Sequence, residues 1–112
     1  MKRGDIFDAR LDPIEGSEQA GIRPVILVSR NAINQYSKVV VIVPVTDAAH
    51  ITRQYPDNVR IPAGTGGLTK DSVALGGQVR AISIFRLLRQ RGVLPEELIK
   101  QVDRALRITL DL

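Results

Sequence analysis

Two apolar stretches dominate the hydrophobic pattern of the chain, Ile22–Ser29 (IRPVILVS) and Val39–Thr46 (VVVIVPVT). Both are rich in β-branched and aliphatic side chains, have strand length and lack helical periodicity, which is typical of β-strands. The polar residues between them, RNAINQYSK, leave room for a turn of helix. The pattern therefore predicts an antiparallel hairpin.

We expect the two strands to pair symmetrically about their connection, so that the numbers of opposed residues sum to 69. Ser29 then faces Val40, and Arg23 faces Thr46 at the open end of the hairpin. Directly opposed side chains start within roughly 5 Å of each other. This register brings a guanidinium and a hydroxyl together, and we take that end of the hairpin as the candidate site.

Proline modifies this hairpin at two points. Pro24 near the beginning of the first strand indicates an edge strand or a strand start, because proline cannot donate to a ladder. Pro44, two residues before Thr46, is expected to interrupt regular pairing and to redirect the residues that follow.

Three further segments have strand patterns. Gly4–Leu11 alternates, with Phe7, Ala9 and Leu11 on one face and Ile6, Asp8 and Arg10 on the other, so we expect a half-buried strand that ends at Asp12-Pro13. Asp57–Ile61 is expected to form a short strand with Val59 and Ile61 on one face. Asp71–Ile82, if extended, projects Gln78 and Arg80 together away from the core, and Gly76-Gly77 marks a bend or a close backbone approach.

Helical signals are concentrated near the C-terminus. Ser83 can cap a short helical turn, IFRLLRQ, that ends at Gly92. Pro95–Leu110 has proline in a first turn, early acids and late arginines, so it predicts an α-helix. Its apolar stripe should cover the sheet: Leu98, Val102, Ala105, Leu106 and Thr109.

These elements predict a single domain over residues 1–112, mainly β, in which an antiparallel barrel or sandwich carries a helix at one side. No apolar run approaches the roughly 20 residues that span a bilayer. The N-terminus has the charge of a signal peptide without its apolar middle. With no cysteine in the chain, we expect a cytoplasmic protein without a membrane association.

A net charge of +4 favours a polyanionic partner. Arginine, which binds phosphate in bidentate fashion, dominates the basic residues after Val79: Arg80, Arg86, Arg89, Arg91, Arg104 and Arg107. A solvated surface with helix-side ion pairs explains the same residues equally well.

Familiar catalytic motifs are absent from the sequence. The segment GTGGLTKD fails the spacing of a phosphate-binding P-loop and indicates a turn. His50 is the only histidine, lies in a polar segment and is interpreted as a surface residue. Without cysteine and with one histidine, neither a metal site nor a cofactor is expected.

The remaining candidate is the group of polar residues expected near the open end of the hairpin: Arg23, Thr46, Ser17, Glu18, Gln19, Gln78 and Arg80. Arginine can neutralise a phosphate or the charge of a transition state, while hydroxyls and amides fix its oxygens. The group therefore predicts an anion site. In the alternative, Arg23 pairs with Glu18 and Thr46 merely ends a strand.

Several segments resemble the MazF/PemK toxin family, in the expected order and almost from end to end: RGDIF at 3–7, PIEGSEQAGIRPV at 13–25, PVT at 44–46, LTKDSV at 68–73, QVRAI at 78–82 and VDRAL at 102–106. The segment around Gly16–Pro24 is the most specific. The resemblance implies an SH3-like barrel of the CcdB/PemK type with a C-terminal α-helix, forming a homodimer.

The resemblance also implies an activity. Members of the family are sequence-specific, metal-independent endoribonucleases that cut single-stranded RNA and stall translation. By position, the catalytic residues fall on Arg23 and Thr46, the Ser-Glu-Gln loop on residues 17–19, and a substrate-contacting glutamine on Gln78. The RNA, or an antitoxin with an acidic disordered tail, is expected to occupy a groove that includes the dimer interface.

The expected reaction is attack of the ribose 2′-hydroxyl on the adjacent phosphate, giving a 2′,3′-cyclic phosphate and a 5′-hydroxyl. Glu18 is a possible base, but the family pattern does not establish it. Gly77 and Ala81 depart from the acid and threonine that many relatives carry, so the recognised RNA sequence cannot be transferred. Ser83 stands in place of a common aspartate, and either residue can cap the turn.

A second hypothesis is a non-catalytic CcdB-like barrel that poisons DNA gyrase or binds a partner. CcdB relies on a terminal tryptophan, whereas this chain has none and ends in TLDL. A generic nucleic-acid-binding barrel would display stacking aromatics, and this chain has only four: Phe7, Tyr36, Tyr55 and Phe85.

Overall fold

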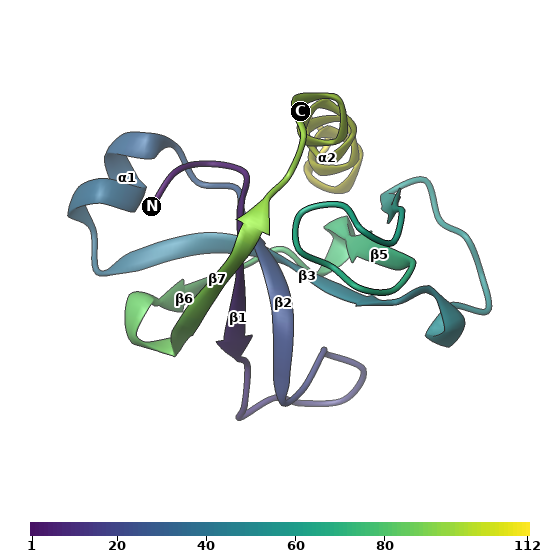
Figure 1. The fold of residues 1–112 in the computed structure, drawn as a ribbon, viewed down its shortest axis with the longest axis horizontal. Helices are drawn as coiled ribbons and strands as arrows, with labels where there is room; N and C mark the ends of the chain where they lie inside the picture. Colours follow the sequence, from purple (N-terminus) through teal and green to yellow (C-terminus); the bar gives the residue numbers. More distant parts are fainter.

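The structure is a computed structural model that describes residues 1–112, and antiparallel strands are its main secondary structure (Figure 1). The strands are β1 (Asp5–Arg10), β2 (Ile22–Leu27), β3 (Val39–Asp47), β4 (Asn58–Ile61), β5 (Ser72–Leu75), β6 (Arg80–Ser83) and β7 (Leu87–Val93). Two α-helices, α1 (Asn31–Tyr36) and α2 (Glu96–Leu110), accompany three short 3-10 turns, η1 (Ala48–His50), η2 (Gly76–Gln78) and η3 (Ile84–Arg86). No helix is both long and apolar enough to cross a membrane.

The strands form one sheet in the order β4-β5-β3-β2-β1-β7, and β6 pairs with the first half of β3. An antiparallel, mainly β fold with a C-terminal helix is therefore confirmed. Closure into a barrel is not, because β4 and β7 at the two ends of the order are not paired. The loop that follows β4 instead packs against β7, where a Cβ atom on Gly67 would lie 2.1 Å from the Arg91 carbonyl oxygen.

The sheet carries a hydrophobic cluster on each face, which explains why the strand sequences are continuous apolar runs. Along β2, Ile26 belongs to a cluster shared with α2, whereas Val25 and Leu27 belong to a second cluster. In β1, Ile6 and Ala9 are both fully buried, one in each cluster. The predicted face of Phe7, Ala9 and Leu11 packs in the second cluster and Arg10 on the opposite face is exposed, but the burial of Ile6 on that opposite face departs from the expected half-buried strand.

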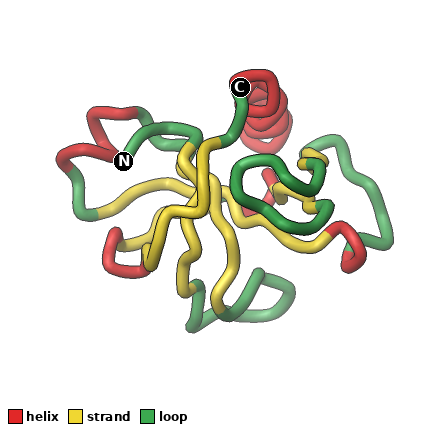
Figure 2. Tube along the Cα trace, in the orientation of Figure 1, coloured by secondary structure: helices red, strands yellow, loops and turns green.

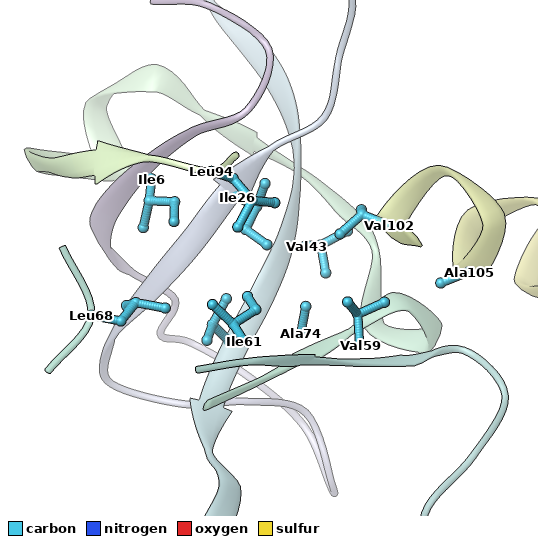
Figure 3. Packing of buried hydrophobic residues seen from close by; sticks show 11 residues of the cluster. Ile6, Ile26, Val43, Val59, Ile61, Leu68, Ala74, Leu94, Val102 and Ala105 are labelled. Carbon is cyan, nitrogen blue, oxygen red and sulfur yellow. The ribbon is translucent and has the colours of Figure 1, made fainter. Parts of the chain in front are cut away.

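Figure 3 shows the larger cluster, where Val102 and Ala105 of α2 meet Val43, Val59 and Ala74 of the sheet. The helix begins one residue later than expected, with Pro95 as its N-cap. The predicted stripe is confirmed, since Val102 and Ala105 are buried and Leu98 and Leu106 pack against the same cluster.

Two expectations for the second half of the chain need correction. Residues 71–82 do not form one strand, because η2 separates β5 from β6 at the predicted glycine bend. Ser83 caps η3 as expected, accepting a hydrogen bond from the Phe85 N–H. The helical turn, however, stops at Arg86, and Leu87–Val93 is strand β7 because it pairs with β1.

Candidate active site

The β2–β3 hairpin has the predicted register over three residue pairs, but the ladder does not extend to the predicted pairs of Arg23 with Thr46 and Ser29 with Val40. Its paired residues are Val25 with Pro44, Ile26 with Val43 and Leu27 with Ile42, and each pair of numbers sums to 69. The connection between the strands contains α1, the expected turn of helix.

The two prolines act at the open end of the hairpin. Pairing of β2 with β3 starts at Val25, directly after Pro24, although β2 is an internal strand and not an edge. At Pro44, β3 stays continuous but changes partner, because the three residues from Val45 onward pair with β5. Thr46 is thereby held between strands, with 3% of its surface exposed.

Arg23 and Thr46 line the same hollow, which has a volume of about 230 Å³ and is called here the Arg23–Thr46 hollow. The Arg23 Nε–H donates to the Ala20 carbonyl oxygen at 3.1 Å, and its terminal guanidinium nitrogens have no partner in the protein. The alternative ion pair with Glu18 is not formed, since the Glu18 carboxylate accepts from the Glu15 N–H instead. One face of the Arg23 guanidinium is therefore available to an anion.

Two other cations line this hollow. Lys70 Nζ lies 3.6 Å from Asp47 Oδ2 and is largely exposed. Arg91 is mostly buried, donates to Asp8 at 3.1 Å and to the Gly67 carbonyl oxygen at 3.0 Å, and so has a fixed position. Basic side chains outnumber the one carboxylate that faces the hollow, and this balance favours a phosphate.

Asp47 is that single carboxylate. Its side chain accepts from the Ala49 N–H at 2.9 Å and so caps η1. This backbone hydrogen bond has the largest effect and lowers the pKa of Asp47 below its usual value; burial opposes it, and the nearby charges of Lys70 and His50 lower the pKa by smaller amounts. The carboxylate is therefore ionised and engaged by its own loop.

The remaining predicted residues gather at a second place. The Gln19 N–H donates to Gln78 Oε1 at 2.9 Å, and Gln78 Nε2 donates to the Ser17 carbonyl oxygen at 3.4 Å. Arg80 Nη1 donates to the Leu11 carbonyl oxygen at 3.4 Å. A hollow of about 190 Å³, the Glu18–Arg80 hollow, is lined by Glu18, Gln19, Gln78 and Arg80. The structure thus links the Ser17–Gln19 loop to Gln78 and Arg80, but not to the wall that Arg23 and Thr46 share.

A third and larger hollow, of about 690 Å³, adjoins both and is called the Tyr55–Asp57 hollow. It shares His50 with the Arg23–Thr46 hollow, and it shares Gln19 and Gln78 with the Glu18–Arg80 hollow. The three form one track. The loops after β1 and β3, which Figure 2 shows in green, below and to the right of the strands, contribute part of its walls, together with strand residues, η2 and the loop after β4.

Sequence reasoning missed several residues of this track. His50 is exposed, as expected of a surface residue, and so is Lys70 of the predicted turn, but sequence reasoning did not place either at the Arg23–Thr46 hollow, which both line. A polar, irregular segment that directly follows the candidate Thr46 was the available signal, because loops at strand ends carry binding residues.

Comparisons with known proteins agree with this architecture. Residues 2–110 match the family model described as PemK-like, MazF-like toxin of type II toxin–antitoxin system. The endoribonuclease MazF of Staphylococcus epidermidis is 38% identical over all 112 residues, which cover 92% of its length. The MazF of Staphylococcus saprophyticus is 37% identical over the same span, with 92% of its length covered.

Among solved structures, MazF from Deinococcus radiodurans has a TM-score of 0.85 and 26% identity, over 100% of this chain and 97% of that one. A mycobacterial endoribonuclease in complex with its cognate antitoxin has a TM-score of 0.81 at 22% identity, over 100% of this chain and 96% of that one, and supports the fold. The matched family model, the full-length identities and the shared fold lead to one conclusion: the chain belongs to the family of PemK-like, MazF-like toxins of type II toxin–antitoxin systems.

Proposed function

We propose that this protein is the toxin endoribonuclease of its system and that it cleaves single-stranded RNA at specific sequences without a metal ion. The observation that carries the proposal is the guanidinium of Arg23, whose terminal nitrogens have no partner in the protein, beside the buried Thr46 in a hollow with excess positive charge. Full-length relatives that are endoribonucleases support the same activity.

The proposed step is an in-line transfer at one phosphate. The ribose O2′ loses its proton and forms a bond to phosphorus, while the bond between phosphorus and O5′ breaks and O5′ takes up a proton. The products are a 2′,3′-cyclic phosphate and a 5′-hydroxyl. Arg23 stabilises the negative charge that develops on the phosphate oxygens, and the Thr46 hydroxyl positions them. DNA is spared because it lacks the 2′-hydroxyl.

Neighbouring nucleotides are proposed to follow the track of three hollows. Gln19 and Gln78 line two of them, and Arg80 and Glu18 line the end away from Arg23. The backbone contacts of Ser17 and Gln19 with Gln78 hold this part of the track together. Side chains that line a groove in this way contact the RNA and select its sequence.

Because the chain belongs to this toxin family, we also propose two protein partners. A second copy of the chain forms a homodimer, and the cognate antitoxin presents an acidic disordered tail. Arg23, Lys70 and Arg91 give the track a positive charge that an acidic tail complements. Occupation of the track by such a tail would block RNA.

The test is incubation of purified protein with mixed-sequence RNA in EDTA. Wild-type protein is expected to cut at a few discrete sites, to leave 5′-hydroxyl ends and to spare DNA of the same sequence. Arg23→Ala is expected to lower the rate by about a hundredfold or more, the usual effect of removing a donor to developing negative charge. Arg104→Ala, at an exposed arginine of α2, is the matched control.

Two outcomes contradict the proposal. Intact RNA under all conditions favours a CcdB-like gyrase poison or a partner-binding protein. Equal cleavage by wild-type protein and Arg23→Ala places the activity at another site or in a contaminant.

A further inference from the structure

The Tyr55–Asp57 hollow differs in character from the Arg23–Thr46 hollow that it adjoins. Its walls combine three apolar or aromatic side chains, Ile51, Tyr55 and Leu75, with polar residues that include Arg53 and the carboxylate of Asp57. Asp57 forms no ion pair with any lysine or arginine, whereas Asp47 in the neighbouring hollow faces Lys70. Arg53 also lines this hollow but forms no ion pair with Asp57, so the carboxylate stays free to accept hydrogen bonds from the edge of a base.

The residues at the rim of this hollow are held by a tight turn. The Asn58 N–H donates to the Tyr55 carbonyl oxygen at 3.0 Å, which closes the four residues Tyr55-Pro56-Asp57-Asn58 into a turn. Proline at the second position pre-sets the backbone of such a turn. About half of the Tyr55 side chain is exposed, so its ring is free to stack on a base.

Asp57 itself is fixed from two sides. Its carbonyl oxygen accepts from the Gly76 N–H at 2.9 Å, and its Oδ2 accepts from the Thr109 hydroxyl of α2 at 3.2 Å. Gly77 makes room for the carboxylate, because a Cβ atom at that position would lie 2.7 Å from Oδ2. The other carboxylate oxygen, Oδ1, has no partner in the protein.

A fixed carboxylate discriminates among the four RNA bases. It only accepts hydrogen bonds, so it favours an edge with adjacent donors. Guanine presents two adjacent donors, N1–H and the N2 amino group, on its Watson–Crick edge. Adenine, cytosine and uracil each place acceptors beside their donor, and these acceptors face the carboxylate unfavourably.

We propose that the Tyr55–Asp57 hollow is a guanine-binding subsite, in which Tyr55 stacks on the base and the Asp57 carboxylate accepts from N1–H and the N2 amino group. This inference rests on the proposed ribonuclease function and extends it to the substrate. The hollow adjoins the Arg23–Thr46 hollow through His50, so the guanine lies close to the cleaved phosphate.

The first test is the base frequency around cleavage sites in a randomised RNA pool. Wild-type protein is expected to favour guanine at one position by about tenfold to a hundredfold, the usual discrimination of a bidentate contact to a base. Asp57→Asn replaces one acceptor with a donor, so the guanine preference is expected to fall and adenine to gain. Asp111→Asn, at the exposed end of α2, is the matched control and keeps the wild-type pattern.

A second test measures binding with a non-cleavable RNA that carries a 2′-O-methyl group at the cleavage site. Replacement of the selected guanine by inosine removes only the N2 amino group, and it should weaken binding to wild-type protein severalfold. The same replacement should have little effect on Asp57→Asn, because the paired acceptor is already lost. Thermal unfolding of each variant separates this result from a loss of folding.

The outcomes distinguish a failure of the proposed ribonuclease function from a failure of the guanine subsite. Wild-type protein that cuts no RNA, whatever its binding, refutes the proposed function. Specific cleavage without a guanine preference, or an Asp57→Asn pattern identical to that of wild-type protein, overturns the guanine subsite alone. Inosine that weakens both proteins equally also overturns it.

Discussion

Gly67→Ala is expected to be severely destabilising, because Gly67 lies where the loop after β4 packs against β7. A Cβ atom at this position would lie 2.1 Å from the Arg91 carbonyl oxygen. Ordinary contact begins near 3.4 Å, so the loop and the strand would have to separate by roughly 1.3 Å. No ladder joins β4 to β7, so this contact is part of what holds the two ends of the sheet together.

The magnitude follows from a comparison with Gly64, which lies in the same loop. Gly64 has a φ of +86° and Gly67 a φ of +78°, but nothing lies within 4 Å of a Cβ atom at Gly64. Gly64→Ala therefore carries only the backbone strain, about 1–2 kcal/mol. Gly67→Ala has the same backbone strain and also forces the loop away from β7. We therefore expect it to lower the free energy of unfolding by more than about 4 kcal/mol, the level reached only by severe disruptions.

The measurement is urea unfolding of wild-type protein and both variants. Their free energies of unfolding are compared with the same dependence on urea concentration for all three proteins. Cleavage by Gly67→Ala should also fall, because Arg91 donates to the Gly67 carbonyl oxygen and lines the Arg23–Thr46 hollow. If the two alanine variants unfold within about 0.5 kcal/mol of each other, a margin usual for independent surface changes, the close approach of loop and strand does not stabilise the fold.

Two other predictions concern stability. Val102→Ala should lower the free energy of unfolding by about 1–3 kcal/mol, because the Val102 side chain, which is 2% exposed, fills space between α2 and the sheet. A change below about 0.5 kcal/mol in urea unfolding would contradict that packing. Since the pKa of Asp47 is lowered in the folded state, its stabilising contribution is present above its unfolded pKa of about 3.9 and is lost as pH falls through the folded value. Asp47→Asn should therefore lose less stability than wild-type protein between pH 5 and pH 2, roughly the range over which such a carboxylate titrates. If the free energies of unfolding of the two proteins change in parallel with pH, the Asp47 carboxylate does not stabilise the fold.

Local signals in the sequence were sufficient for the hairpin and the main helix. The register of β2 with β3 was predicted because a short, symmetric connection leaves little freedom in how two neighbouring strands pair. The α2 helix and its stripe were predicted because both depend on spacing within one segment. Recognition of family motifs placed Arg23 and Thr46 together, and the hairpin register alone led to the same pair.

The errors have one physical origin, pairing and packing between distant segments. Leu87–Gln90 had a helical pattern, but β7 lies beside β1, more than 75 residues earlier in the chain, and extended pairing there outweighs local preference. The half-buried pattern of β1 failed at Ile6, because residues from β2, β3 and α2 provide a second core on the face that was expected to meet solvent. Neither partner could be identified from the strand itself.

The sequence alone determined which segments are strands, where the hairpin ends and which residues lie at its open end, because these properties depend on spacing along a few neighbouring residues. Only the tertiary structure decided that His50 and Lys70 join Arg23, and that Tyr55 and Asp57 form the wall of an adjoining hollow. Those positions depend on where the ends of β3, β5 and α2 meet. That meeting is set by packing of the whole core, which no local pattern encodes.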